Sequence, residues 1–312
     1  MSSSAPSFPK LMKKLRFLLS LHTRDNDFQV AQAAAGEQMA RKLGIDLEIV
    51  YADSDAVNQS TQVLNAIQSR SGERPDAIIL EPISNIALPQ AAAAASAAGI
   101  GWAVLNRTPD YIAQLRRTAN APVFTVAMDN LEIGRIQGRQ FAALLPRGGS
   151  ILYVEGPSRS SSAKKRTDGM METKPANIQV GTLKGEWTEQ SALRSVRSWL
   201  KLATSQNASA DLVGAQDDTM AMGARKAFQE IVDPKERQRW MSLPFTGCDG
   251  QPATGQCWVR DGLLTATVFI APFAGQAIEI LARAIKTGTQ PPEQVLTTSH
   301  SIPPLDALRR KS

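Results

Sequence analysis

Polar and aromatic side chains follow many of the short apolar runs in this sequence, and their types suit hydrogen bonding to a small polar molecule. Basic side chains donate strong hydrogen bonds, carboxylates and amides accept them, and aromatic rings cover the apolar face of a sugar. The combination predicts a binding site for a polyhydroxylated molecule. The residues concerned are Asn26, Phe28, Asn106, Arg107, Lys164, Trp187, Asp217 and Asp249.

Patterns typical of catalysis are scarce. The histidines are His22 and His300, and the chain has no phosphate-binding glycine-rich loop, Gly-x-Ser-x-Gly or His-Glu-x-x-His motif. A pair of carboxylates is the machinery of glycoside hydrolysis, so an enzyme that uses Asp217 and Asp249 is the alternative to a receptor. We favour a non-catalytic receptor.

The cysteines, Cys248 and Cys257, do not complete a zinc site, because no further cysteine or nearby histidine accompanies them. No metal and no cofactor are therefore expected. Free thiols are the simpler interpretation of the two residues, and a disulfide between them is left open.

Apolar runs alternate with helical stretches along the chain, which is typical of an open α/β sheet. Most runs lack strict alternation, so we expect strands buried on both faces of a parallel sheet. The helical stretches 31–44 and 88–99 end at Gly44 and Gly99, which act as C-caps. The predicted strands are Leu15–Leu21, Asp46–Tyr51, Ala77–Leu80, Gly101–Leu105, Val123–Ala127, Ser150–Val154, Ile178–Leu183, Leu212–Ala215, Leu243–Gly247 and Ala266–Phe269.

The order of elements repeats. Segments 46–82 and 177–218 each run from a strand through a polar turn and an apolar-periodic helix to a second strand. This repetition predicts two similar α/β domains. Ligands of parallel sheets bind beyond the carboxyl ends of the strands, and the polar residues named above fall there.

Structural roles compete with binding at several of these positions. Arg107 could serve an internal ion pair, Asp249 could cap the turn after it, and Trp187 and Phe28 could belong to the core. Asp218 is predicted to cap the helix that begins at Thr219.

From about residue 15 to 295 the chain resembles the periplasmic sugar-binding proteins of the ribose-binding type and the effector domains of lac-repressor-type regulators. The matching motifs are "NDF" (26–28), "RPDAIILEP", "VLNR" (104–107), "AMDNLEIGRIQG", "KKRTDGM", "GEWTEQSA", "AQDDTMAMGA" and "FTGCDGQP". The resemblance implies two similar Rossmann-like domains with parallel sheets, joined by a multi-strand hinge and closing on a ligand in the cleft between them. It implies lobes of residues 1–128 plus 271–296 and 129–270 plus 297–312.

The resemblance also assigns ligand contacts and shows departures from the family pattern. It places Lys164 where the family often has an arginine, and it adds two positions to the predicted site. These are Gln29, at a common aromatic position, and Ile270, at a common amide position. Asn106 stands for an aspartate, Glu81 for an asparagine, and Asp217 for an amide that can donate. A sugar or polyol other than ribose is the first expectation, and an anionic or zwitterionic solute is the second.

The expected partner is a transporter permease or a sensor protein. A regulator without its own DNA-binding head is the alternative. The net charge of +6 is dispersed in short basic clusters without a nucleic-acid-binding motif, so no direct nucleic-acid binding is expected. No apolar run approaches the roughly 20 residues of a membrane span.

The stretch "LRFLLSL" (15–21) predicts the first strand rather than a secretory leader, because Arg16 and Ser20 interrupt it and no small-x-small cleavage site follows. The prediction is therefore a cytoplasmic protein, or a periplasmic one if a natural leader was omitted.

Overall fold

The computed structural model of the protein describes residues 14–24, 27–70, 73–83, 87–202 and 210–309. The chain forms two compact units. The first comprises residues 1–127 and 272–295, and the second comprises residues 128–271 and 296–312. The chain therefore crosses from one unit to the other after residues 127, 271 and 295. The boundaries expected from the sequence were residues 128, 270 and 296.

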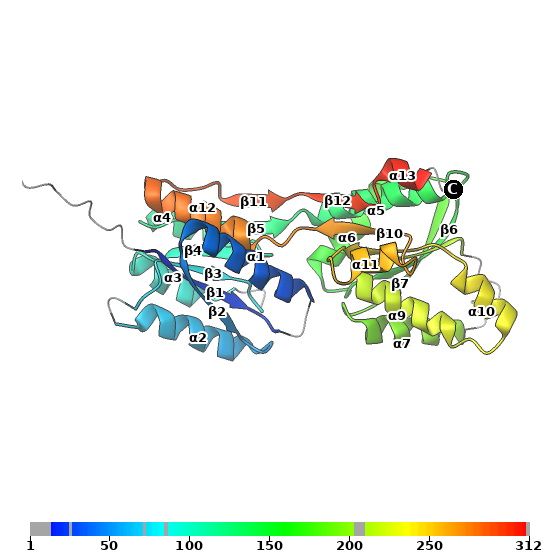
Figure 1. Ribbon diagram of the computed structural model, residues 1–312, viewed down its shortest axis with the longest axis horizontal. Helices are drawn as coiled ribbons and strands as arrows, with labels where there is room; N and C mark the ends of the chain where they lie inside the picture. Colours follow the sequence, from blue (N-terminus) through cyan, green and yellow to red (C-terminus); the bar gives the residue numbers. More distant parts are fainter. Residues whose placement is uncertain (1–13, 25–26, 71–72, 84–86, 203–209, 310–312) are drawn as a thin grey trace, which may run out of the picture. The chain divides into compact units, whose positions relative to one another are not determined.

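The first unit is built on a six-stranded sheet whose neighbouring strands are β11-β5-β4-β3-β1-β2 (Figure 1). The pairs among β1 to β5 are parallel, and β3 and β4 are completely buried. Such strands need apolar residues on both faces, which explains the continuous apolar runs. The strands are β1 (Arg16–Leu21), β2 (Asp46–Tyr51), β3 (Ala77–Leu80), β4 (Gly101–Leu105), β5 (Val123–Met128) and β11 (Gln294–Thr297).

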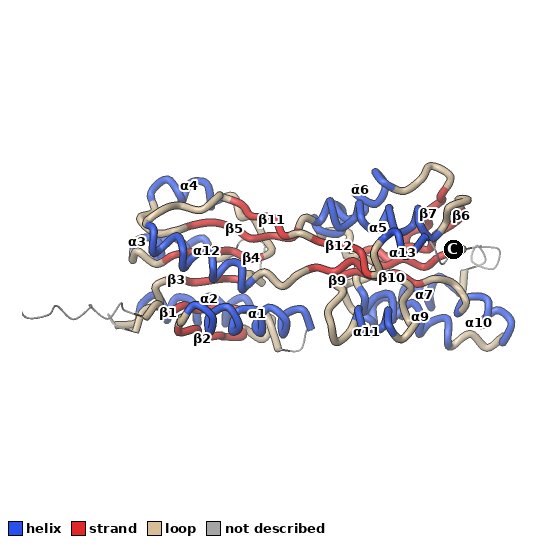
Figure 2. The backbone as a smooth tube through the Cα atoms, turned by 45° about the horizontal axis from the view of Figure 1, so that its top comes forward, coloured by secondary structure: helices blue, strands red, loops and turns tan. Residues whose placement is uncertain are grey.

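Helices form two groups around this sheet (Figure 2). Helix α1 packs against α12, and Leu19 of β1 faces this pair, since its side chain lies beside Gly36 and Ile278. The adjacent Leu18 belongs to the core formed with the other group. The helices are α1 (Asp27–Leu43) and α12 (Ala274–Thr287), and then α2 (Ala56–Gln68), α3 (Pro89–Ala97) and α4 (Tyr111–Thr118).

The second unit repeats this plan with a sheet ordered β12-β10-β9-β8-β6-β7. Strands β6 to β10 pair in parallel, and β12 is antiparallel to β10. Its strands are β6 (Gly149–Glu155), β7 (Ile178–Lys184), β8 (Leu212–Ala215), β9 (Phe245–Asp249), β10 (Ala266–Ile270) and β12 (Ser299–Ile302). Its helices are α5 (Asn130–Leu144), α6 (Ser161–Thr173), α7 (Glu189–Leu200), α9 (Asp218–Gln229), α10 (Pro234–Met241), α11 (Gly255–Arg260) and α13 (Leu305–Arg309).

The two sheets have the same strand order when β1 to β5 are matched with β6 to β10. The predicted repeat of two similar α/β domains is therefore confirmed. Each unit contains one helix that directly follows a strand of the other unit. Helix α5 follows β5 of the first unit but belongs to the second, and α12 follows β10 of the second unit but belongs to the first.

Most of the predicted elements are confirmed. The opening run forms β1, so its interpretation as a strand is correct. Gly44 and Gly99 both have positive φ, 68° and 71°, after helices α1 and α3, as C-capping glycines do. Strands β11 and β12 were not predicted.

Helices α5 and α6 approach closely enough for backbone contact. A Cβ atom added to Gly134 of α5 would lie 2.0 Å from the carbonyl oxygen of Arg166, and one added to Gly169 of α6 would lie 2.0 Å from the carbonyl oxygen of Leu131. Only glycine fits at these positions. This contact fixes the place of α6, and therefore of Arg166, within the second unit.

Within the part of the chain that the structure describes, no helix combines the length and apolarity needed to cross a bilayer.

Candidate functional site

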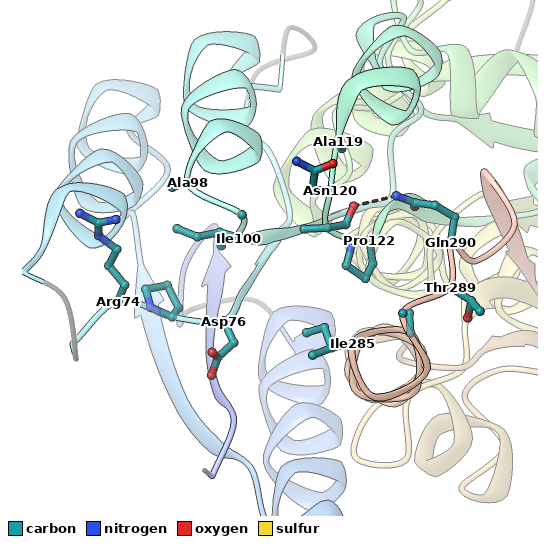
Figure 3. A pocket seen from close by; sticks show the side chains of 15 residues that line it. Arg74, Asp76, Ala98, Ile100, Ala119, Asn120, Pro122, Ile285, Thr289 and Gln290 are labelled. Atoms are coloured by element: carbon teal, nitrogen blue, oxygen red, sulfur yellow. Dashed lines mark hydrogen bonds between the residues drawn. The ribbon is translucent and has the colours of Figure 1, made fainter. Parts of the chain in front are cut away.

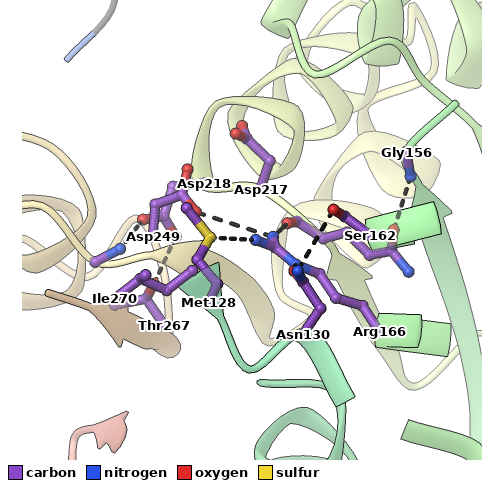
Figure 4. A network of polar contacts seen from close by, with 12 residues as sticks. Met128, Asn130, Gly156, Ser162, Arg166, Asp217, Asp218, Asp249, Thr267 and Ile270 are labelled. Carbon is purple, nitrogen blue, oxygen red and sulfur yellow. Dashed lines mark hydrogen bonds and ion pairs between the residues drawn. The ribbon is translucent and has the colours of Figure 1, made fainter. Parts of the chain in front are cut away.

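Arg166 is the centre of a polar cluster in the second unit, at the carboxyl ends of its strands (Figure 4). The residue is 5% exposed, and helix α6 carries it there. Its Nε donates to Asn130 Oδ1 at 3.0 Å and its Nη1 donates to the carbonyl oxygen of Gln216. Nη1 also lies 3.9 Å from Asp249 Oδ1. The guanidinium is thus held rigidly, and it is the cation nearest to Asp249 among the described residues.

Gln216, the residue after β8, holds α6 against the end of β6. Its Oε1 accepts from the backbone N–H of Gly156 at 2.9 Å, and its Nε2 donates to the carbonyl oxygen of Ala163 at 3.0 Å and to Thr167 Oγ1 at 2.9 Å. An amide with one acceptor and two donors can make all three bonds, and a carboxylate cannot. Gln216 therefore positions the helix that carries Arg166.

Asp249 ends β9 in an unusual backbone conformation, with a φ of 95°. Gln251 stabilises this turn, because its Nε2 donates to the carbonyl oxygens of Asp249 at 3.1 Å and Ile270 at 3.0 Å. The Asp249 side chain is 25% exposed. Apart from the neighbouring Asp217 carboxyl, no donor of the described residues forms a hydrogen bond with its carboxylate, which leaves acceptor capacity for a ligand.

Asp218 does not cap the helix as predicted from the sequence. The capping residue is Asp217, whose Oδ1 accepts from the backbone N–H groups of Thr219 at 2.7 Å and Met220 at 3.0 Å. Asp218 is buried instead and accepts from Gly250 N and Thr267 Oγ1, both at 2.7 Å. The sequence could not separate two adjacent aspartates, since either could start the helix.

Burial raises the pKa of Asp218 well above its usual value, and the charge of Asp249 adds to this effect. Its hydrogen bonds with Gly250 and Thr267 hold the turn after β9 in place.

Burial also raises the pKa of Asp249, to about 7. The neighbouring Asp217 carboxylate adds to the shift by repulsion and by a hydrogen bond, while Arg166 opposes it.

The stability of the protein without ligand should fall as the pH rises from about 4 to about 7. In this range folded Asp249 holds a proton that the unfolded chain, with a pKa near 3.8, has lost. The folded state therefore binds more protons, and its stability falls by at most about 1.4 kcal/mol per pH unit. Asp249→Asn should remove this contribution. Urea unfolding between pH 5 and 8 measures both, and equal slopes in the two proteins would refute the assignment.

Trp187 follows β7 and lies over the end of β6, in a backbone conformation with a φ of 59°. Its ring packs on Gly156, where an added Cβ atom would lie 2.3 Å from Cζ2. The guanidinium carbon of Arg166 lies 5.4 Å from the ring centroid. The half-buried Trp187 also borders the core of the second unit. It therefore packs against the core and contacts the Arg166 cluster at the same time.

Lys164, a predicted contact, is placed away from this cluster. Its side chain is 75% exposed and pairs with Asp168 at 2.6 Å. Arg166, two residues later, occupies the place beside Asp249 instead. The sequence carried the signal, because the Arg-x-x-Gly pattern in "KKRTDGM" begins at Arg166 rather than Lys164. Ile270 is fully buried and interacts with Gln251 through its carbonyl oxygen.

In the first unit, Glu81 is the centre of a buried group at the end of β3. It is 2% exposed, and its carboxylate accepts from Asn106 Nδ2 at 3.3 Å and Gln32 Nε2 at 3.5 Å. The Oε1 of Gln32 accepts from the backbone N–H groups of Phe273 and Ala274, both at 2.8 Å. These bonds tie β3, β4, α1 and the start of α12 together. The sequence did not identify Gln32.

The other predicted residues of the first unit lie at the same edge of its sheet. The Phe28 ring packs on Phe273 with centroids 5.8 Å apart, and the buried Gln29 accepts from the backbone N–H of His22 at 3.0 Å. Arg107 follows β4, and its Nε is buried without a hydrogen-bond partner among the described residues. Asn26 lies outside the described residues.

A cavity of about 610 Å³ lies at the opposite, amino-terminal edge of this sheet (Figure 3). Its lining includes Asp76, Ile100 and Pro122, which precede β3, β4 and β5, and Gln290. It contains none of the predicted contacts. Cys248 and Cys257 are both free thiols, and the described residues contain no cluster of three or more metal-ligating side chains.

A family model described as "Periplasmic binding protein domain" matches residues 17–290. The chain belongs to this family. Among periplasmic binding proteins, the ribose import binding protein of Salmonella typhimurium is 24% identical over 285 residues, which are 91% of this chain and 89% of that protein. The D-apiose import binding protein of Paraburkholderia graminis is 27% identical over 285 residues, with 89% and 84% covered.

Solved structures of periplasmic binding proteins share the fold. An ABC transporter periplasmic solute binding protein from Actinobacillus succinogenes with bound D-allose is similar with a TM-score of 0.78 and 21% identity, over 95% of this chain and 100% of that chain. An ABC transporter solute binding protein from Bacillus halodurans with bound myo-inositol has a TM-score of 0.70 and 20% identity, with 96% and 98% covered. The predicted periplasmic-binding-protein fold and family are therefore confirmed.

Proposed function

We propose that this protein is a non-catalytic receptor that binds a sugar or polyol with the side chains at the carboxyl ends of its strands. The observation that carries the proposal is the Arg166 cluster, in which a buried guanidinium lies between the Trp187 ring and the Asp249 carboxylate. Such a group offers a donor, an acceptor and an apolar face in one place, which is what a sugar ring requires.

The similar proteins support this ligand class. Two of them are named for the import of ribose and D-apiose, and two of the solved structures contain bound D-allose and myo-inositol. The proposed contacts in the second unit are Arg166, Trp187, Asp217 and Asp249. Those in the first unit are Phe28, Asn106 and Arg107. Asn26 and Gln29 are also proposed as contacts, on the basis of the sequence prediction. Arg166 replaces Lys164 in this set, since Lys164 is exposed and paired with Asp168. Ile270 is proposed to act through its backbone.

The proposed partner is the permease of an ABC transporter, as the names of the similar solved proteins suggest. Pull-down with the ABC transporter permeases of the source organism, in the presence and absence of ligand, tests this. The description of the family suggests the periplasm as the compartment. Fractionation of the source cells decides between this location and the cytoplasm favoured by the sequence.

A thermal-shift screen across pentoses, hexoses and inositols should find at least one ligand that raises the melting temperature, because a ligand that binds only the folded state stabilises it by about 2.7 kcal/mol at 100 times its Kd. The bound molecule should be recovered chemically unchanged after prolonged incubation. No shift with any member of the panel would contradict the ligand class, and conversion of the ligand would contradict a receptor without catalysis.

A further inference from the structure

The side-chain amide of Gln32 has a fixed orientation, because backbone groups determine it. Gln32 lies on helix α1 and is fully buried. Its Oε1 accepts from the backbone N–H groups of Phe273 and Ala274, both at 2.8 Å. A backbone N–H group can only donate, so the amide oxygen must face the start of α12 and the Nε2 group must face the other way.

The Nε2 group of Gln32 faces Glu81, and Glu81 in turn orients Asn106. Glu81 is 2% exposed. Its Oε2 lies 3.5 Å from Gln32 Nε2, and its Oε1 lies 3.3 Å from Asn106 Nδ2. A carboxylate has no proton to donate, so it requires a donor at each oxygen. Asn106 must therefore turn its Nδ2 group, and not its oxygen, toward Glu81.

The backbone of Glu81 and Asn106 is held as well. Glu81 N donates to the carbonyl oxygen of Ser20 at 2.9 Å, and its own carbonyl oxygen accepts from Gln59 Nε2 at 2.8 Å. Asn106 N donates to the carbonyl oxygen of Val126 at 2.8 Å. A change in the hydrogen bonding of the Glu81 side chain is therefore compensated most easily by rotation of the Asn106 amide group.

Asn106 Oδ1 is the last atom of this chain of hydrogen bonds. No donor of the residues that the structure describes contacts it, and Asn106 is partly exposed directly after β4. The proposed ligand lies beyond this carboxyl edge of the sheet. An amide oxygen in this position can accept a hydrogen bond from a ligand hydroxyl and cannot donate one.

We propose that Glu81 makes Asn106 a hydrogen-bond acceptor for the ligand, so that this receptor selects a sugar or polyol with a hydroxyl at this point over an analogue whose corresponding group can only accept. The proposal rests on the proposed sugar-binding function of the same site. Glu81 is a positioning residue here. It does not touch the ligand, but its carboxylate determines which end of the Asn106 amide the ligand meets.

Glu81→Gln should reverse this selection, because it replaces the carboxylate with an amide of the same size. Gln32 still offers its Nε2 group, so the new amide must turn its oxygen to Gln32 and its nitrogen to Asn106. The Asn106 amide then rotates to accept this bond, and its Nδ2 group faces the ligand. A hydroxyl can accept as well as donate, so an unmodified sugar should still bind, whereas a group that only accepts gains a partner.

Isothermal titration calorimetry with fluorinated ligands tests the proposal. The probes are D-ribose, D-allose and myo-inositol, each compared with its monofluoro-deoxy analogues, in which fluorine replaces one hydroxyl and cannot donate. In the wild-type protein, fluorine at the hydroxyl that contacts Asn106 should weaken binding about tenfold or more, because an acceptor loses its donor. In the Glu81→Gln protein, the same analogue should bind within about threefold of its parent, a difference below about 1 kcal/mol.

Addition of Asn106→Asp to Glu81→Gln is the rescue. The new carboxylate accepts from the new amide with one oxygen and offers its other oxygen to the ligand, so the fluorine penalty of the wild-type protein should return. A purely structural role of Glu81 would weaken the parent and its analogues alike and would leave their ratio unchanged.

Glu155→Gln is the matched control, because it also replaces a buried carboxylate with an amide. Glu155 is 4% exposed in the second unit and accepts from Thr167 Oγ1 at 2.7 Å. This variant should leave the fluorine penalty of every analogue as it is in the wild-type protein.

A wild-type protein without a fluorine penalty, a Glu81→Gln protein that keeps it, or a double variant that lacks it overturns the role of Glu81 and leaves the sugar receptor standing. If circular dichroism shows that Glu81→Gln does not fold, the double variant still decides, since it retains one carboxylate and one amide in the pair. Absence of binding by all three parent molecules counts against the sugar receptor itself, and the role of Glu81 falls with it.

Discussion

Arg166→Ala should weaken ligand binding roughly 100-fold, because removing one partner of a buried charged pair costs about 2–5 kcal/mol. The guanidinium is 5% exposed and lies between the Trp187 ring and Asp249. Its loss removes the only cation that the described residues place beside Asp249. It also leaves Asn130 Oδ1 and the Gln216 carbonyl oxygen without their donor. Calorimetric titration with the best ligand of the screen measures the effect.

Lys164→Ala is the control for this variant, since Lys164 lies on the same helix but is exposed and pairs with Asp168. Its effect on affinity should stay within about twofold, as for other exposed ion pairs. If Lys164→Ala weakened binding as much as Arg166→Ala, the placement of Lys164 outside the site would be wrong. Far-ultraviolet circular dichroism of both variants checks that loss of binding is not loss of folding.

Gly134→Ala should destabilise the second unit by about 3 kcal/mol or more. The new methyl group would lie 2.0 Å from the Arg166 carbonyl oxygen, and backbone cannot move aside as a flexible side chain can. Overpacking typically costs about 1–3 kcal/mol, occasionally more, and this contact is between two backbones. The separation of α5 and α6 would also shift Arg166, so affinity should fall with stability.

Urea unfolding followed by tryptophan fluorescence measures this change, because Trp187, Trp199, Trp240 and Trp258 belong to the second unit and only Trp102 belongs to the first. Gly181→Ala is the matched control. Gly181 is exposed on β7, and an added Cβ atom there would lie 3.9 Å from its nearest neighbour. A Gly134→Ala protein as stable as Gly181→Ala would show that the two helices separate without cost.

The fold was largely predictable because its signals are local. Fully buried strands such as β3 and β4 need unbroken apolar runs, and the helices between them end at glycines with positive φ. Strands β11 (Gln294–Thr297) and β12 (Ser299–Ile302) lack such runs, since each is short, partly exposed and at the edge of its sheet. Their pairing is set by distant strands, which a local pattern does not show.

The candidate site was predictable in position and less so in detail. The rule that ligands lie beyond the carboxyl ends of parallel strands led to Asp249, Trp187 and Asn106. The rule could not tell which residue of helix α6 points toward the site. The sequence analysis therefore named Lys164 as the ligand contact, whereas the structure buries Arg166 there and leaves Lys164 exposed. Nor could it show that Gln32 and Gln216 hold the elements together, because a glutamine with three buried hydrogen bonds looks like any surface glutamine in a sequence.

The exchange of helices between the two halves of the chain affects how the protein is made. Helix α12 covers α1 and the first sheet, and residues 272–295 complete the first unit. A ribosome that has synthesised only the first 127 residues has therefore produced a sheet without its covering helix and without its edge strand. Nascent chains at this stage should depend on chaperones, and the first unit should reach its protease-resistant form only after residue 295 has left the exit tunnel.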